Sequence, residues 1–228
     1  MREFNALRYY PQPREPRGVG PHIRTIRNRI VASYRDKEYY DGDRNNGYGG
    51  LKYDGRWKII AKSMYEDYGL NEESAVLQIG CEKGFLLHDF HEQFPKMIIR
   101  GVEISDYAIA NSMQSVKPYI FKNDYTTLPF QDKTFDFVVA IGVIYTLTLR
   151  DAIACLREIQ RVGKGRSFIT LGAYRDNEGA RLFQYWTLLG TTILHVDEWV
   201  EVLNEAGYTG DYHFMTDEHL NLKEIPSK

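Results

Sequence analysis

Short apolar runs alternate with segments of helical periodicity from residue 58 onward. The apolar runs predict buried strands at 75–79, 97–102, 119–121, 135–141, 167–171 and 211–215. The helical segments between them predict helices at 58–69, 85–94, 106–115, 149–162, 179–189 and 197–206. Strands that alternate with helices favour a parallel sheet covered on both faces. The pattern therefore predicts an α/β fold with a Rossmann-like, doubly wound and mostly parallel sheet.

The first 57 residues show neither the helical nor the strand periodicity clearly. Four prolines predict an extended arm over residues 1–21 that need not be ordered, and residues 23–40 loosely suggest a helix. Residues 39–57 hold five glycines and five aromatic residues. Rings are costly to leave in water, so we expect this segment to be a lid or site wall rather than a solvent loop. We divide the chain into an arm and Tyr/Gly-rich lid at 1–57 and a Rossmann-like domain at 58–228.

The charge of the chain is unevenly distributed. Residues 1–35 hold eight arginines, no lysine and two acids, a formal charge of +6. Because the whole chain carries −2, the remainder carries −8. Such an arm can clamp phosphates or a partner, or it can dock on its own acidic domain.

The cysteine content is typical of a reducing compartment. Cys81 and Cys155 are the only cysteines, which argues against a disulfide framework or a zinc site. There is no apolar signal core and no run of about 20 apolar residues. We expect a cytoplasmic protein without membrane association, and no cluster has the spacing of metal ligands.

A glycine turn follows the first predicted strand of the domain. The strand 75–79 stops at Gly80, and the turn ends at Gly84, where a helical pattern begins. Bare backbone and the free N–H groups of a helix end suit a nucleotide-like ligand. Glu103 follows Gly80 by 23 residues at the end of the next strand, where a carboxylate can accept both hydroxyls of a ribose. A surface acid is the alternative for Glu103.

Two further strand ends carry candidate groups. The third strand is followed by Asn123, Asp124 and Tyr125, which can bind the edge of an adenine; the alternative for Asp124 is a turn. The fourth strand leads through Ile141 to Tyr145, which lies over the reacting end of a ligand or simply caps the core. These groups belong to one edge of the sheet because parallel strands end together.

Taken in order, four motifs resemble those of the class I S-adenosylmethionine-dependent methyltransferases. The similarity covers about 74–174, with a glycine-rich motif at 76–84, an acidic loop at 102–105, an adenine loop at 123–136 and a helix motif at 156–162. The resemblance implies S-adenosyl-L-methionine as cofactor and S-adenosyl-L-homocysteine as product. It implies cofactor contacts from Gln78, Gly80, Cys81, Gly84, Glu103, Ile104, Asn123, Asp124, Tyr125 and Ile141.

The sequence departs from the family pattern at two positions. Gln78 stands where the family usually has an acid, and Glu82 replaces the middle glycine. A glutamine can still accept a hydrogen bond from an ammonium group, but without charge assistance. A non-catalytic cofactor-binding or scaffold protein is therefore one alternative.

The flanking segments resemble a bacterial branch associated with surface-polysaccharide and sugar biosynthesis. The similar segments are 40–44, 47–50, 192–199 and 207–212. This resemblance implies methylation of a polar small molecule, a sugar or nucleotide sugar, at oxygen or nitrogen. The second alternative is a nucleic-acid methyltransferase that uses the arginine-rich arm. A homodimer packed through the aromatic segment is also compatible with the sequence.

A hydroxyl acceptor needs a nearby base. His195 is the first candidate, at the start of a helix beyond the fifth strand, although such a histidine also caps helices; Asp43 and Tyr145 are the others. Candidate acceptor-binding residues are Arg44, Tyr48, Tyr53, Arg56 and Tyr174. The alternative for Arg44 and Arg56 is an ion pair with Asp41 or Asp54.

Overall fold

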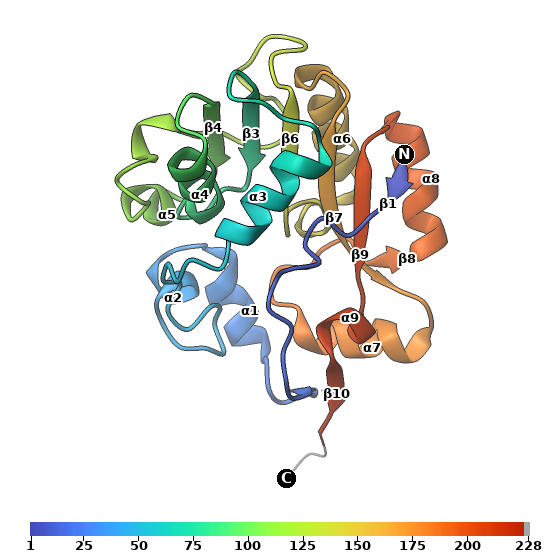
Figure 1. The fold of residues 1–228 in the computed structure, drawn as a ribbon. Helices are drawn as coiled ribbons and strands as arrows, with labels where there is room; N and C mark the ends of the chain where they lie inside the picture. The colour runs from blue at the N-terminus through green and yellow to red at the C-terminus, as the bar shows by residue number, and fades with distance from the viewer. Residues whose placement is uncertain (226–228) are drawn as a thin grey trace.

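A computed structural model describes residues 1–225; the last three residues of the predicted domain 58–228 lie outside the described residues. The central sheet is parallel at every pairing (Figure 1). Its strand order is β5 (Ile120–Lys122), β4 (Ile98–Glu103), β3 (Ala75–Ile79), β6 (Phe137–Ala140), β7 (Ser167–Tyr174), β9 (Asp211–Met215) and β1 (Arg2–Glu3). The short β8 (Leu194–His195) pairs with the end of β7. The predicted Rossmann-like fold is confirmed.

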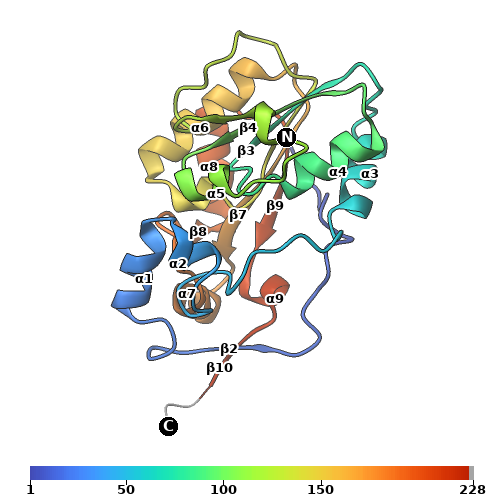
Figure 2. The same ribbon diagram turned by 90° about the vertical axis from the view of Figure 1, so that its left-hand side faces the viewer.

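Helices cover both faces of the sheet. One face packs against α3 (Lys58–Asp67) and α4 (Phe85–Gln93), and the other against α6 (Leu149–Val162) and α8 (Val196–Ala206) (Figures 1 and 2). Successive residues of a strand face opposite sides, so Leu77 joins one core and Val76 the other. The two-sided burial explains why the strands appear as continuous apolar runs in the sequence.

Local signals set the ends of the best-predicted helices. The Thr148 hydroxyl accepts the N–H of Asp151 and begins α6, whose apolar stripe faces the core. Gly207 ends α8 with φ of +67°, a conformation that favours glycine. Both helices lie where the sequence predicts them, within one residue at each end.

A smaller layer lies beyond the carboxyl ends of the strands. It contains α1 (Ile26–Ser33), α2 (Lys37–Tyr40), α7 (Asn177–Trp186), α9 (Asp217–Leu220) and the strand pair β2 (Arg17–Val19) and β10 (Leu222–Glu224) (Figure 1). Phe183, Leu182 and Leu220 form its apolar centre. This layer faces the strand ends at which the sequence places a ligand.

The N-terminal arm is ordered by pairing with strands far away in the sequence. β1 adds to the free edge of β9, and Arg2 forms a bidentate ion pair with Asp211 at 2.7 and 3.1 Å. Farther along, Arg8 pairs with Asp67 at 2.6 Å, and Ala6 and Leu7 are buried. The arm docks on its own domain because an open sheet edge and two acids are available to it.

Several predicted boundaries are corrected by the structure. The loose helix at 23–40 is two helices, separated at Arg35, whose φ is +48°. The helix predicted at 106–115 is only α5 (Asp106–Ala110), with Ser105 as its cap, and a short 3-10 turn, η1 (Lys117–Tyr119), precedes β5. The helix predicted at 179–189 begins and ends earlier, because Asp176 caps it at the Gly179 N–H. A second 3-10 turn, η2 (Ile144–Thr146), follows β6.

No helix within residues 1–225 combines the length and the apolar character that crossing a bilayer requires.

Candidate active site

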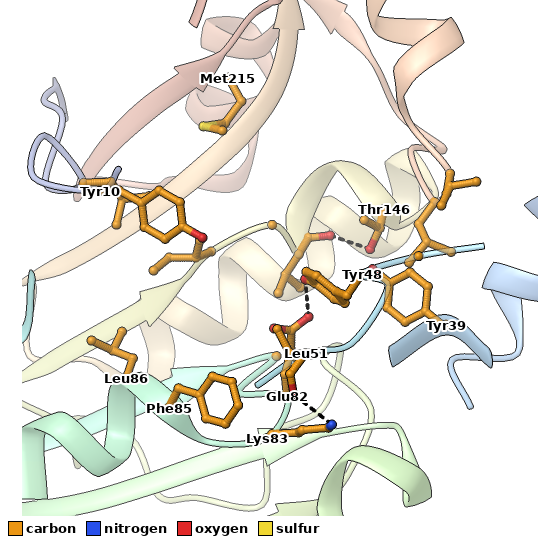
Figure 3. Close-up of a pocket in the computed structure, with 18 of the residues that line it drawn as sticks. Tyr10, Tyr39, Tyr48, Leu51, Glu82, Lys83, Phe85, Leu86, Thr146 and Met215 are labelled. Atoms are coloured by element: carbon orange, nitrogen blue, oxygen red, sulfur yellow. Dashed lines mark hydrogen bonds between the residues drawn. The ribbon is translucent and has the colours of Figure 1, made fainter. Parts of the chain in front are cut away.

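A cavity of about 480 Å³ lies between the carboxyl ends of the sheet and the smaller layer. Its sheet side consists of the turn after β3 and residues 141–146 after β6. Its other walls come from the arm, from the lid at 39–57 and from residues 186–189 after α7. Figure 3 shows Tyr48 of the lid in contact with Glu82 of the turn, and Leu51 beside Lys83.

The turn after β3 requires glycine at its first position. Gly80 has φ of +66°, and a Cβ there would collide with the side chain of Val143. The N–H groups of Gly80 and Cys81 donate to the Val102 carbonyl at 2.8 and 3.2 Å, which ties the turn to β4. Gly84, with φ of +76°, is the N-cap of α4.

Gln78 presents an unpaired oxygen to the cavity wall. Its side chain is buried, and its Oε1 has no hydrogen-bond partner within the described residues. A buried acceptor without a partner costs about 1–3 kcal/mol, which a ligand N–H would recover. Nearby Gly142 has φ of +71° and open space where a side chain would be. These features fit the ammonium end of S-adenosylmethionine.

Glu103 lies at the base of the cavity. Its carboxylate accepts the N–H groups of Glu82, Ile104 and Ser105 at 2.8–2.9 Å, and the Tyr125 hydroxyl lies 3.5 Å away. The side chain is 1% exposed. The carboxylate retains lone pairs that a ribose can use, but a ribose reaches them only after the surrounding side chains move.

Glu82, the residue that replaces the usual middle glycine, turns toward the lid. Its φ is +51°, and its carboxylate accepts a 2.5 Å hydrogen bond from the Tyr48 hydroxyl (Figure 3). Burial raises the pKa of Glu82 to about 7, with the negative Glu103 adding to the rise and the Tyr48 hydrogen bond opposing it. A carboxyl with a pKa near neutrality in a cavity wall is suited to proton transfer.

Lys83 holds the lid from the next position of the turn. Its ammonium, on a side chain only 8% exposed, contacts both Asp41 oxygens at 2.7 and 2.8 Å and the Leu51 carbonyl at 3.0 Å. Burial would raise the pKa of Asp41, but hydrogen bonds from Lys83 and Tyr107 lower it below its ordinary value. The lid is therefore fastened to two successive residues of the glycine turn.

The structure brings most of the predicted cofactor residues into one wall. Gln78, Gly80, Cys81, Glu103, Tyr125 and Ile141 line the cavity, whereas Gly84, Ile104, Asn123 and Asp124 do not. The Asp124 carboxylate closes a turn on the hydroxyl and N–H of Thr126 and on the Thr127 N–H. These contacts, the Thr126 hydroxyl first, lower the pKa of Asp124. Asn123 donates to nearby carbonyls, and Ile104 borders a separate hollow near residues 33–36.

The predicted acceptor residues divide similarly. Arg44, Tyr48 and Arg56 line the cavity, and Arg56 pairs with Asp54 at 2.5 Å. Tyr53 instead donates to Asp89 of α4 at 2.6 Å and anchors the lid on that helix. Tyr174 lies at the end of β7 outside the lining, with its ring 5.7 Å from that of His195.

Of the predicted bases, only Tyr145 lines the cavity. Burial raises the pKa of Tyr145 to about 12, so its hydroxyl stays protonated at neutral pH. His195 is the N-cap of α8, where its ring accepts the Asp197 N–H at 3.3 Å and lies 3.1 Å from the Arg175 carbonyl. Asp43 accepts the Asn45 N–H in an exposed turn.

Several lining residues were not among the sequence candidates. They are chiefly polar groups: Arg17, Arg24, Arg35 and Tyr39 from the arm and lid, Lys83 from the glycine turn and Thr146 from η2. The only sequence signal for the arginines was the charge of the arm, which does not say where each side chain points. Within residues 1–225, no group of three or more His, Cys, Asp or Glu residues could hold a metal ion.

Replacing Glu82 by Gln should change how stability depends on pH. The pKa of Glu82 in the folded protein, about 7, lies above the ordinary glutamate value of 4.5, so the folded state binds this proton more tightly. Its contribution is complete below about pH 4.5 and is lost as the pH rises through 7. We expect the stability of Glu82→Gln, measured relative to the wild type, to be greater at pH 8 than at pH 5. Urea unfolding at both values measures this, with exposed Glu201→Gln as control. An equal difference at both pH values would contradict the assignment.

Replacing Lys83 by Met should loosen the lid. The variant leaves the half-buried Asp41 carboxylate without its cation, and we expect a loss of about 1–3 kcal/mol and faster proteolysis within residues 39–57. Lys96→Met is the matched control, because Lys96 forms an exposed pair with Glu72 that should contribute less than about 1 kcal/mol. Limited proteolysis and urea unfolding measure both effects. Equal behaviour of the two variants would show that the Lys83 contacts do not hold the lid.

Comparisons with known proteins agree with this geometry. Residues 77–171 match the sequence profile of a family described as the methyltransferase domain. This segment contains the glycine turn, Glu103 and the strands up to β7. No curated protein matches the chain significantly.

Solved structures share the fold at low sequence identity. The YcgJ protein of Bacillus subtilis superposes with a TM-score of 0.54 at 18% identity, over 64% of this chain and 66% of its own. A candidate methyltransferase from Bacillus halodurans gives 0.53 at 14% identity, over 64% and 68% of the two chains. A candidate S-adenosyl-L-methionine-dependent methyltransferase from Methanococcus maripaludis gives 0.51 at 19% identity, over 66% and 76%. The matched domain and the shared fold support an enzyme of the S-adenosylmethionine-dependent methyltransferase type.

Proposed function

We propose that the protein transfers the methyl group of S-adenosylmethionine to a polar small molecule, a sugar or nucleotide sugar, at oxygen or nitrogen. The observation that carries the proposal is the single cavity of about 480 Å³ with two unlike sides. One side holds the glycine turn with the unpaired Gln78 oxygen, and the other is lined by tyrosine hydroxyls and guanidinium groups. A cavity of this size and polarity suits a small polar acceptor.

The sheet side would hold the cofactor, which supplies an electrophilic methyl group on a sulfonium. Gln78 would accept a hydrogen bond from the ammonium group, and Glu103 would accept the ribose hydroxyls. The Gly80 turn lets the ligand approach the backbone closely.

The lid side would orient the acceptor and exclude water. Tyr39, Tyr48 and Leu51 cover the turn, and Tyr145 offers a protonated hydroxyl. Glu82 is the best-placed proton acceptor, because it lines the cavity and its pKa is about 7. Positioning and a dry site account for most of the rate enhancement expected of such an enzyme.

The sugar assignment draws its support from the lid. Residues 40–44 and 47–50, which resemble the branch associated with surface-polysaccharide and sugar biosynthesis, form the lid itself. Two arm arginines, Arg2 and Arg8, pair with the protein's own acids. No contact of the described residues therefore favours a nucleic-acid acceptor over a small molecule.

Calorimetry with S-adenosylhomocysteine tests the cofactor site. We expect micromolar binding by the wild type, roughly tenfold weaker binding by Gln78→Leu, and tighter binding by Gln78→Asp because the ammonium gains a charged partner. Gln131→Leu, in an exposed loop, is the control. Absence of wild-type binding at high micromolar concentration would refute both the enzyme and the cofactor site.

The acceptor class is tested by transfer of a labelled methyl group. We expect incorporation into one or more of a panel of nucleotide sugars, with little dependence on salt, and none into duplex DNA or RNA. Incorporation into nucleic acid that falls steeply with salt would favour the alternative acceptor instead.

A further inference from the structure

Three arginines from separate segments line the same part of the cavity. Arg17 comes from β2, Arg24 precedes α1 and Arg44 belongs to the lid. All three lie outside residues 77–171, the segment that matches the methyltransferase domain. They are therefore features of this chain's additions to the fold and do not belong to the cofactor wall.

None of the three forms an ion pair with an acid of the described residues. Arg24 donates to the Trp186 carbonyl and Arg44 to the Gly47 carbonyl at 2.5 Å, and no side-chain contact satisfies Arg17 within residues 1–225. Other arginines pair with carboxylates, as in Arg2 with Asp211 and Arg56 with Asp54. Arg17, Arg24 and Arg44 differ from these because they line one cavity without an acidic partner among residues 1–225.

The three charges are close enough to repel one another. The pKa of Arg24 falls to about 10, first because of burial and then because of Arg44, Arg29 and Arg17. Burial and Arg44 likewise lower the pKa of Arg17. Nearby His219 adds no further positive charge at pH 7, because burial and Arg17 lower the pKa of its imidazole.

The acids of the cavity are committed to other contacts. Glu82 accepts the Tyr48 hydroxyl, and Glu103 accepts three backbone N–H groups on the cofactor side. Asp54 is held by Arg56. The cavity is therefore divided into a cofactor side with two carboxylates and an opposite side with uncompensated positive charge.

We infer that Arg17, Arg24 and Arg44 form a binding site for a phosphate or diphosphate group carried by the methyl acceptor. Guanidinium groups bind phosphate oxygens through directed, charge-assisted hydrogen bonds. Three such groups around one space match a diphosphate, which brings at least two negative charges and many acceptor oxygens. The inference rests on the proposed function and narrows its acceptor to phosphorylated or nucleotide-activated sugars.

Inorganic pyrophosphate is the probe for this site. Calorimetry at fixed ionic strength should detect binding to the wild-type protein, and affinity should fall as sodium chloride is added. Arg24→Gln and Arg44→Gln should each weaken binding roughly tenfold, and Arg24→Lys should give an intermediate loss because it keeps the charge without the planar fork. Arg27→Gln is the matched control, since Arg27 is an exposed arginine of α1 outside the cavity lining.

Thermal unfolding tests whether the variants remain folded. Removing one of three mutually repelling charges should leave the melting temperature without ligand unchanged or raised, and pyrophosphate should raise it more in the wild type than in Arg24→Gln. If Arg24→Gln does not fold, Arg24→Lys and Arg44→Gln carry the comparison.

Two results would overturn the inference. One is no pyrophosphate binding by the wild type, and the other is equal weakening by Arg27→Gln and Arg24→Gln. Binding of S-adenosylhomocysteine, measured on the same samples, distinguishes failure of the anion site from failure of the proposed function. If the wild type binds S-adenosylhomocysteine but not pyrophosphate, only the anion site is contradicted, whereas absence of cofactor binding by the wild type contradicts the proposed function.

Discussion

The carboxylate of Glu103 joins the two strand ends on which the site is built. It accepts one N–H from the turn after β3, at Glu82, and two from the loop after β4, at Ile104 and Ser105. A carboxylate that is 1% exposed is stable only when its oxygens are well bonded, so these contacts are obligatory. They fix the conformation of the turn after β3, and the position of the lid depends on that conformation.

Two successive residues of the glycine turn, Glu82 and Lys83, both hold the lid. Glu82 accepts a hydrogen bond from the Tyr48 hydroxyl, and Lys83 donates to the Asp41 carboxylate and the Leu51 carbonyl. A glycine at position 82 would provide no such contact. The departure at this position therefore reflects a turn that binds a lid as well as the proposed cofactor.

The sequence was sufficient to predict those parts of the fold that local patterns determine. The strand at 75–79 and the helix at 149–162 lie where their patterns place them. A short apolar run and a capped apolar stripe each predict their element from local sequence alone. β1, β2 and β10 escaped prediction because each is a few residues long and forms only against a partner distant in the chain.

The candidate site was predictable on its cofactor side and less so elsewhere. Gln78, Gly80 and Glu103 belong to an ordered motif and meet at one sheet edge. The same reasoning could not decide whether His195 is a general base or the N-cap of a helix, because a histidine in either role can lie at the start of a helix. Nor could it gather Arg17, Arg24 and Arg44, whose proximity arises only when the arm folds over the sheet.

The double attachment of the lid to the turn has a kinetic consequence. A ribose must displace covering side chains to reach Glu103, while Arg44 and Tyr48, two walls of the proposed acceptor side, belong to the lid that does the covering. An open lid thus admits the cofactor but leaves the acceptor site incomplete. Under the proposed function, this arrangement predicts an order of binding in which S-adenosylmethionine enters before the acceptor.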